Sequence, residues 1–377
     1  MIKHWILFSF SLFFFHSFYA QEETENTLKL LFLGDIMGHG PQIKAAYNST
    51  SKTYNYENNF QYMQPIFAKA DYTIANLEVT LGTKPYSGYP QFSSPIELAI
   101  AAQNAGIDIL ATANNHSCDR RKKGIVKTIE VLDSLHISHF GTYTSPEEKA
   151  VNLPLLIEKN NIRVALLNYT YGTNGIAIPK GTVVNLLDKE TIENDVLIAK
   201  AYQPDQIIAF VHWGQQYKNL ASASQKKWFN YFKSLGVNIV IGSHPHVVEP
   251  MEWDKTQNSL VVYSLGNFVS NQRTFPRDGG AVFELVLSKK ETKTTIKSAQ
   301  YLLTWVYKQT NKNKDAYFVL PVDEYLYKKP FFDKPSDFNK MHKYAKHTRK
   351  LLNKNNLNIT EKKPFTEFAY RLLYSIM

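Results

Sequence analysis

The sequence predicts an α/β fold, because apolar runs typical of buried strands alternate with helical patterns along much of the chain. Five of these runs end at polar residues. The expected strands cover residues 27–33, 72–77, 107–113, 207–211 and 237–241. The polar residues that follow them include Asp35, Glu78, Asn114, Asn115, His116, His212, His244 and His246. The carboxyl ends of strands line the ligand crevice in α/β folds, so we expect these side chains to converge.

Helical patterns over residues 95–105, 124–135 and 225–235 separate these strands, and the first and third end at glycines. Further runs at 260–264, 281–287, 296–307 and 316–320 predict a second β layer. Beyond Pro321 the composition shifts to Lys, Asn, Tyr and Phe, which predicts a basic helix over 336–353 and a short helix over 365–374. We therefore expect a main domain over 27–322 and a basic helical extension over 323–377.

The first 20 residues have the outline of a signal peptide. Lys3 precedes an apolar run over 5–15, and Ala20 offers a small residue for cleavage. Export to the periplasm or the cell exterior is the expectation. A retained anchor would leave the protein membrane-associated, although a run of about eleven apolar residues is short for a span. Cys118 is the only cysteine, so no internal disulfide can form.

The net charge of the 377-residue chain is +10, which favours an anionic partner. Long-range attraction of this kind suits nucleic acid, anionic lipid or an acidic polymer, and the charge does not choose among them. A solubility role explains the surplus equally well.

Carboxylate, amide and imidazole groups at strand ends are the ligands that a pair of borderline divalent ions such as Mn, Zn or Fe needs. Such ions activate water and neutralise charge on a phosphoryl or acyl oxygen. Each residue alone has a structural explanation: Asp35 suits a turn, and His212 suits a hydrogen-bonded core position. Their joint placement favours a metal site. His116 could supply a proton, and His39 is near enough to Asp35 to reach a metal.

Motifs along the chain resemble those of the CapA family of poly-γ-glutamate capsule biosynthesis proteins, a branch of the calcineurin-like metallophosphoesterases. The resemblance covers about residues 30–322. Its motifs are Gly34-Asp35-Ile36-Met37, Ala75-Asn76-Leu77-Glu78, Asn114-Asn115-His116 with Asp119 and Gly124, His212-Trp213-Gly214 with Tyr217, Gly242-Ser243-His244-Pro245-His246-Val247-Val248, and Tyr263-Ser264-Leu265-Gly266-Asn267-Phe268. The resemblance implies a four-layer αββα sandwich with a dimetal centre at the strand ends.

The same resemblance implies a division of ligands, with Glu78 bridging the two ions. Asp35 and His246 would hold one ion, while Asn115, His212 and His244 would hold the other. His116 would be catalytic. We further expect substrate contacts from His39, Asn114, Trp213 and Asn267.

Two departures, one from the wider superfamily and one from the capsule branch, bear on activity. Met37 stands where typical metallophosphoesterases carry a histidine, as it does across the capsule branch, so one ion is expected to bind more weakly. Gln216 stands where the capsule branch usually has Glu.

Three functions stay open at this point. The first is synthesis, transfer or processing of an acidic cell-surface polymer by a metal-dependent hydrolase or transferase. The second is a non-catalytic subunit that holds polymer for a membrane synthase or exporter. The third is an extracytoplasmic phosphoesterase. The expected ligand is an acidic polymer or a phosphoester, and no nucleic acid is expected.

Overall fold

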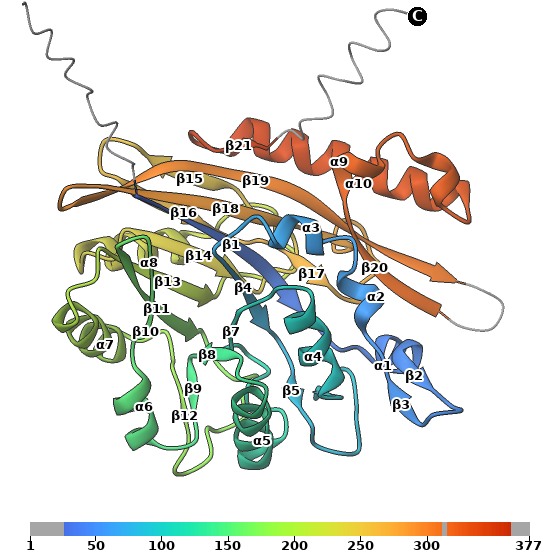
Figure 1. Cartoon of the computed structure of the whole chain (residues 1–377), viewed down its shortest axis with the longest axis horizontal. Helices are drawn as coiled ribbons and strands as arrows, with labels where there is room; N and C mark the ends of the chain where they lie inside the picture. Colours follow the sequence, from blue (N-terminus) through green and yellow to red (C-terminus); the bar gives the residue numbers. More distant parts are fainter. Residues whose placement is uncertain (1–25, 311–314, 363–377) are drawn as a thin grey trace, which may run out of the picture.

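The computed structural model describes residues 26–310 and 315–362, and its largest element is a nine-stranded sheet (Figure 1). The strands run in the order β20-β19-β18-β1-β4-β7-β8, with β17 paired to β1 and β21 paired to β19. They are β1 (Asn26–Ile36), β4 (Tyr72–Leu77), β7 (Ile109–Ala111), β8 (Ser138–Phe140), β17 (Asn267–Val269), β18 (Gly279–Lys290), β19 (Lys293–Thr310), β20 (Asp315–Pro321) and β21 (Thr360–Glu361). The predicted signal peptide and the predicted helix over 365–374 lie outside the described residues.

A six-stranded sheet packs face to face with the first. Its order is β10-β11-β13-β14-β16-β15. The strands are β10 (Leu155–Lys159), β11 (Ile162–Thr170), β13 (Gln206–His212), β14 (Ile239–Ser243), β15 (Met251–Asp254) and β16 (Ser259–Val262). Three short two-stranded pairs complete the strands of the described residues: β2 (Tyr47–Asn48) with β3 (Thr53–Tyr54), β5 (Thr80–Leu81) with β6 (Ser93–Ser94), and β9 (Thr142–Tyr143) with β12 (Val183–Val184).

The distribution of strands between the two sheets corrects one prediction. The runs at 207–211 and 237–241 were expected beside the first three strands, with everything from 260 onward in another layer. Instead β13, β14 and β16 lie together in the six-stranded sheet, and β18 returns to pair antiparallel with β1. Local apolar patterns do not encode which distant strand supplies the hydrogen-bond partner. The prediction also lacked β10 and β11, although β11 is an internal strand of its sheet.

The sheets and helices form four layers. Alternate residues of β1 explain why both of its faces are buried: Leu30 and Phe32 point toward the second sheet, whereas Leu31 and Leu33 point toward the helices. The cluster between the sheets joins Phe32 to Phe210 on β13, whose rings meet edge to face at 6.1 Å. The predicted αββα architecture is confirmed.

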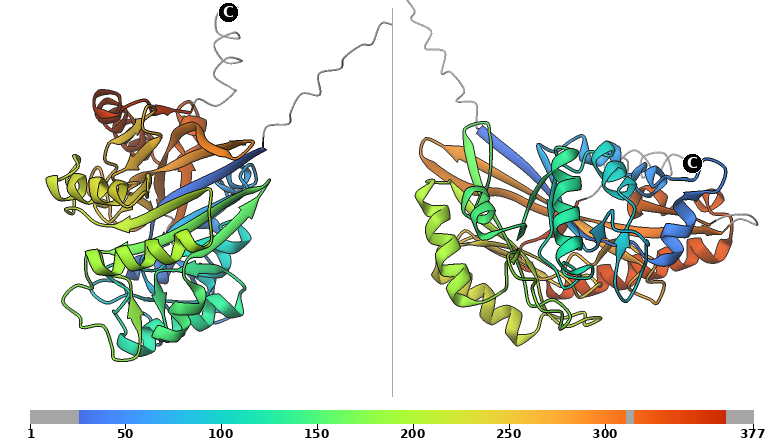
Figure 2. Two further views of the ribbon diagram at one scale, coloured as in Figure 1. Left: turned by 90° about the vertical axis from the view of Figure 1, so that its left-hand side faces the viewer. Right: turned by 90° about the horizontal axis from the view of Figure 1, so that it is seen from below.

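Helices cover the outer faces of both sheets, as the two rotated views in Figure 2 show. Those that pack on the nine-stranded sheet include α1 to α5, and α7 and α8 cover the six-stranded sheet. The helices are α1 (Gly40–Ala46), α2 (Glu57–Phe60), α3 (Gln64–Phe67), α4 (Glu97–Asn104), α5 (Arg121–Ser134), α6 (Pro146–Asn152), α7 (Lys189–Ala201), α8 (Ala223–Ser234), α9 (Val322–Tyr325) and α10 (Pro335–Asn355), with a 3₁₀ turn at Lys329–Phe331. Within the described ranges, none of these helices has the length and apolarity that crossing a bilayer requires.

The predicted basic helix is α10, and it packs against the long strand β19 (Figure 1). Met341, Tyr344 and Ala345 bury their side chains in the same apolar cluster as Trp305 and the inter-sheet core. The residues beyond 322 are thus joined to the main core through this apolar contact. The domain boundary at 322 remains a prediction from composition.

Candidate metal centre

Parallel pairing places the polar strand ends side by side. Asp35 on β1 is in register with Asn76 on β4, and His212 on β13 is in register with Ser243 on β14. Glu78 follows β4 directly. Close contact between backbones holds this edge together, because the Asp35 N–H donates to Gly266 O at 3.0 Å. A Cβ on Gly34 would lie 1.9 Å from that same oxygen, so only glycine permits the approach.

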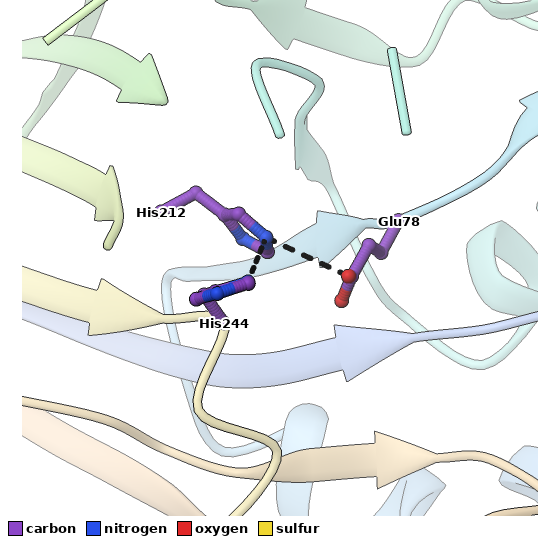
Figure 3. Close-up of side chains that lie close together, drawn as sticks. All are labelled: Glu78, His212 and His244. Atoms are coloured by element: carbon purple, nitrogen blue, oxygen red, sulfur yellow. Dashed lines mark hydrogen bonds and ion pairs between the residues drawn. The ribbon is translucent and has the colours of Figure 1, made fainter. Parts of the chain in front are cut away.

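The first group of candidate ligands consists of Glu78, His212 and His244 (Figure 3). His212 Nε2 lies 3.5 Å from Glu78 Oε1 and 3.1 Å from His244 Nδ1. Asn115 extends the group, since its Oδ1 lies 2.6 Å from the same His212 nitrogen. Four side chains therefore direct N and O atoms toward one place, as predicted.

The second group consists of Asp35, Glu78 and His246. His246 Nδ1 lies 3.1 Å from Asp35 Oδ2 and 3.1 Å from Asn267 Oδ1, and its Nε2 lies 3.8 Å from Glu78 Oε1. Glu78 belongs to both groups. The structure thus brings together all six residues predicted as ligands.

Glu78 is the residue that most strongly favours a cation at this centre. Its side chain is fully buried, and neither carboxylate oxygen has a hydrogen-bond partner among the described residues. Burial, followed by the neighbouring Asp35 carboxylate, raises the pKa of Glu78 well above its usual value. A buried carboxylate without a donor is costly unless a cation offsets its charge. The residues present therefore fit divalent cations, which the two groups that include Glu78 would hold.

Burial keeps the imidazoles of His212 and His244 in the form that can bind a metal. Burial lowers the pKa of His212 well below its ordinary value, and burial followed by His246 lowers the pKa of His244 to about 3. Both rings are therefore neutral at physiological pH and each keeps a nitrogen lone pair for coordination. Carboxylate and imidazole together suit Zn, Mn or Fe, and the structure does not select one of them.

The loop after β14 holds two ligands in unusual backbone conformations. His244 has φ 101° and His246 has φ 59°, both in the left-handed region that glycine occupies freely. Such conformations cost energy for residues with a Cβ and recur where function requires them. Pro245 between them restricts the loop further.

Two residues that the sequence analysis left without a role orient these ligands. Asn76 donates from Nδ2 to Asp35 Oδ1 at 2.8 Å, and the same nitrogen lies 3.3 Å from His212 Nδ1. Ser243 Oγ lies 3.0 Å from His212 Nδ1. These contacts direct His212 Nε2 toward the ligand group. A polar Asn inside the apolar run before Glu78 was the signal available in the sequence.

His116, predicted as the catalytic residue, is oriented by a carboxylate. Its Nδ1 lies 2.7 Å from Asp119 Oδ2, which also accepts the Phe92 N–H at 2.6 Å. The Phe92 ring contacts the imidazole edge to face at 4.6 Å. With Nδ1 directed at Asp119, Nε2 is the ring nitrogen left to exchange a proton with a bound molecule.

The four residues predicted to contact substrate differ in how their polar atoms are used. The Asn114 side chain donates to Leu77 O at 2.8 Å and accepts from the His116 N–H at 3.0 Å. The buried Trp213 indole donates to Tyr263 O at 2.9 Å. These contacts serve the fold of the site, and substrate contacts by Asn114 and Trp213 remain predictions.

Asn267 orients His246, as described above, and donates from Nδ2 to Arg277 O at 2.8 Å. His39 lies at the start of α1, where its Nδ1 is 3.1 Å from Gln42 Oε1 and accepts the Asn271 N–H at 3.3 Å. Burial lowers the pKa of His39 to about 4. Neither candidate ligand group includes His39. Its predicted contact with substrate stays a prediction, as does that of Asn267.

Met37 and Gln216 lie in different surroundings. Met37 is buried among apolar side chains of the nine-stranded sheet and its helices. Gln216 is exposed on the loop after β13. The second ligand group consequently has a single imidazole among its members.

Comparisons with known proteins agree with the predicted resemblance. Residues 29–272 match the sequence model of the family described as bacterial capsule synthesis protein PGA_cap. The chain is 29% identical over 259 residues to the capsule biosynthesis protein CapA of Bacillus anthracis, covering 65% of this chain and 60% of that protein. It is 26% identical over 278 residues to the PGA biosynthesis protein CapA of Bacillus subtilis (strain 168), covering 71% of this chain and 70% of that protein.

Among solved structures, the calcineurin-like phosphoesterase YfkN from Bacillus subtilis is similar with 14% identity and a TM-score of 0.46. That similarity covers 86% of this chain and 98% of the other. The aligned part of this chain spans less than two thirds of the Bacillus anthracis relative.

Proposed function

The chain belongs to the family of bacterial capsule synthesis proteins PGA_cap, and on that premise we propose that it is an exported metal-dependent hydrolase or transferase acting on an acidic cell-surface polymer. The polymer we favour is poly-γ-glutamate-like, because the relatives are named for capsule and PGA biosynthesis. The net charge of +10 would attract such a chain.

The observation that carries this proposal is the pair of unpartnered Glu78 oxygens between two groups of imidazole and carboxylate side chains. Divalent ions bound there would supply an activated water and neutralise charge on a phosphoryl or acyl oxygen. Asp35, Glu78 and His246 would hold one ion. Asn115, His212 and His244 would complete the other position with Glu78.

The residues around the ligands would handle orientation and protons. Asn76 and Ser243 fix the His212 ring, and Asn267 fixes the His246 ring. When water adds to the substrate and the ester or amide bond breaks, the leaving group needs a proton. His116 Nε2 would deliver it while Asp119 stabilises the positive charge that the ring carries before the transfer.

A test compares metal content and turnover in the wild type and in His244→Ala. Elemental analysis and hydrolysis of bis(p-nitrophenyl) phosphate and of polyglutamate are measured on the same preparations. His244→Ala should lose bound metal and lower turnover about a hundredfold or more, since even the loss of an outer partner costs 10- to 100-fold. His139→Ala is the matched control, because His139 contacts Asp133 away from the site. Equal turnover in wild type and His244→Ala would reject the enzymatic proposal.

A non-catalytic polymer-holding subunit is the second candidate, and the buried Met37 favours it. The second ligand group has one imidazole, and without its ion the site would bind polymer but not cleave it. Tight polyglutamate binding that is indifferent to chelators, with no turnover, would support this candidate. Phosphodiester turnover without polyglutamate binding would instead indicate an extracytoplasmic phosphoesterase. A membrane synthase or exporter as partner belongs to the same proposal and is tested by co-purification from membranes.

A further inference from the structure

A stacked arrangement of side chains connects the metal centre to a basic residue on its rim. Tyr217, on the loop after β13, stacks on the His246 ring with a centroid separation of 6.0 Å and an interplanar angle of 29°. The Arg277 guanidinium carbon lies 3.4 Å from the centre of the Tyr217 ring. The Tyr217 ring therefore connects the Arg277 guanidinium to the His246 ring.

Backbone contacts fix both members of this stack to metal ligands. The Tyr217 N–H donates to Pro245 O at 2.8 Å, between the two ligand histidines. Arg277 O accepts from Asn267 Nδ2 at 2.8 Å, and Asn267 Oδ1 lies 3.1 Å from His246 Nδ1. The position of Arg277 relative to the second ligand group is thus set by the same contacts that orient His246.

Arg277 keeps its donors available. Its side chain makes no hydrogen bond or ion pair to any residue within 26–310 or 315–362, and it is only partly buried. A guanidinium stacked flat on an aromatic ring still presents its N–H groups around its edge. That geometry matches the two oxygens of a carboxylate or of a phosphate.

A second cation lies beside the loop that carries Arg277, which comprises residues 270–278 and is called here the rim loop. Lys343 on α10 places Nζ 4.5 Å from the centre of the Phe275 ring, two residues before Arg277. His347 joins α10 to this edge, since its ring contacts Phe275 at 4.9 Å and its Nε2 lies 3.0 Å from Asn219 Nδ2. The basic helix therefore borders both loops that flank His246.

We propose that Arg277, with Lys343 beyond it, forms an anion subsite on the rim of the metal centre that binds a carboxylate or phosphate group next to the group held at the metals. This inference rests on the proposed function, of which it specifies the substrate class. An acidic chain would place one unit at the ligand groups while a neighbouring oxyanion pairs with Arg277. Neither residue falls within the segment that matches the family model, residues 29–272.

The test measures binding of a labelled oligoglutamate and of inorganic phosphate to the metal-loaded full chain, by fluorescence anisotropy and competition. Arg277→Gln should raise the Kd about tenfold, because it removes charge-assisted hydrogen bonds. Lys343→Gln should raise it about twofold to threefold, since an exposed cation contributes less. Both variants should also make the Kd less sensitive to salt, a readout that a purely structural stack would leave unchanged.

Lys255→Gln is the matched control. Lys255 lies 4.7 Å from the Trp253 ring in the turn between β15 and β16, at the sheet edge opposite the ligand groups. Its Kd should equal that of the wild type. Arg277-dependent binding of oligoglutamate would assign the subsite to polymer carboxylates, and Arg277-dependent binding of phosphate alone would assign it to a phosphoester. If Arg277→Gln changes the Kd of neither probe, the proposed subsite is wrong. Binding needs no turnover, so this outcome is separate from that of the hydrolysis assay.

Discussion

The two ligand groups that share Glu78 differ in the donors they bring. The first combines the imidazoles of His212 and His244 with the Asn115 amide oxygen, and Ser243 and Asn76 orient His212. The second has Asp35 and one imidazole, that of His246.

Nitrogen ligands add affinity for borderline ions, so the first group should bind its ion more tightly than the second. We therefore expect Glu78 to serve two positions of unequal affinity. Changes to Glu78, His244, His246 and Met37 test this inequality, and Glu249 is a buried carboxylate outside both groups that serves for comparison.

Replacing the shared ligand should have the largest effect. Glu78→Gln keeps the shape of the side chain but removes its charge from both groups, so we expect both ions to be lost and turnover to fall about a thousandfold or more. Elemental analysis and hydrolysis assays on the purified variant measure this. Retention of one ion by Glu78→Gln would show that the groups are independent of each other.

Metal-free protein offers a second readout of the same change. The pKa of Glu78 is raised in the fold, so the stability linked to this group is present below its ordinary pKa and is lost as pH rises through the raised value. Metal-free Glu78→Gln has no ionisable group at this position and so keeps its stability as the pH rises. At neutral pH it should therefore melt at a higher temperature than the metal-free wild type.

Removing one histidine from each group should separate the two positions. His244→Ala should weaken the tighter ion about a hundredfold, whereas His246→Ala should eliminate only the weaker ion. Calorimetric titration of metal-free protein with Zn²⁺ or Mn²⁺ reports both sites in one experiment. Identical titration curves for the two variants would contradict the inequality.

Glu249 tests whether burial alone explains the behaviour of Glu78. It is fully buried, and its Oε2 accepts from Gln225 Nε2 at 2.7 Å, but it belongs to neither ligand group. Burial raises the pKa of Glu249 to about 8, so its stabilising contribution is complete below its ordinary pKa of 4.5 and is lost as pH rises toward 8.

Glu249→Gln should therefore gain about 2 to 3 kcal/mol relative to wild type between pH 4.5 and pH 7, with no change in metal content. Urea unfolding across this pH range measures the gain. A change in bound metal would show that Glu249 takes part in the centre.

Adding a ligand to the weaker group should give the smallest effect. Met37→His supplies an imidazole two residues after Asp35 and should tighten the second ion about tenfold, while burial of a polar ring lowers stability by about 1 to 3 kcal/mol. Met37→Leu serves as the control, because it preserves the apolar surroundings. Tighter binding in both variants would argue against coordination by residue 37.

Much of this centre could be predicted because its residues mark the ends of apolar runs. Glu78 directly follows β4, and His212 is the last residue of β13, so each lies at a strand end of its own sheet, and the side chains meet where these ends come together. The pairing of strands could not be predicted in the same way. Nothing local in the run at 281–287 indicates that β18 returns to β1 across some 250 residues of sequence.

Contacts made across the fold were missed for a related reason. In the sequence Ser243 is only a small residue at a strand end. In the structure its hydroxyl lies 3.0 Å from His212 Nδ1. Arg277 lies ten residues from Asn267, in a loop without periodicity, and only the stack on Tyr217 relates it to the metal centre. Orientation by outer partners depends on three-dimensional neighbours, which sequence spacing does not specify.

The central place of β1 has a consequence for how the chain acquires its structure. β1 is the first element of the described residues, yet its antiparallel neighbour β18 ends at Lys290. In a nascent chain the edge of β1 opposite β4 therefore lacks this partner until about three quarters of the length has been synthesised, and contacts this distant slow folding. Until β18 is synthesised, that edge of β1 stays unpaired and is open to pairing with a strand of another chain.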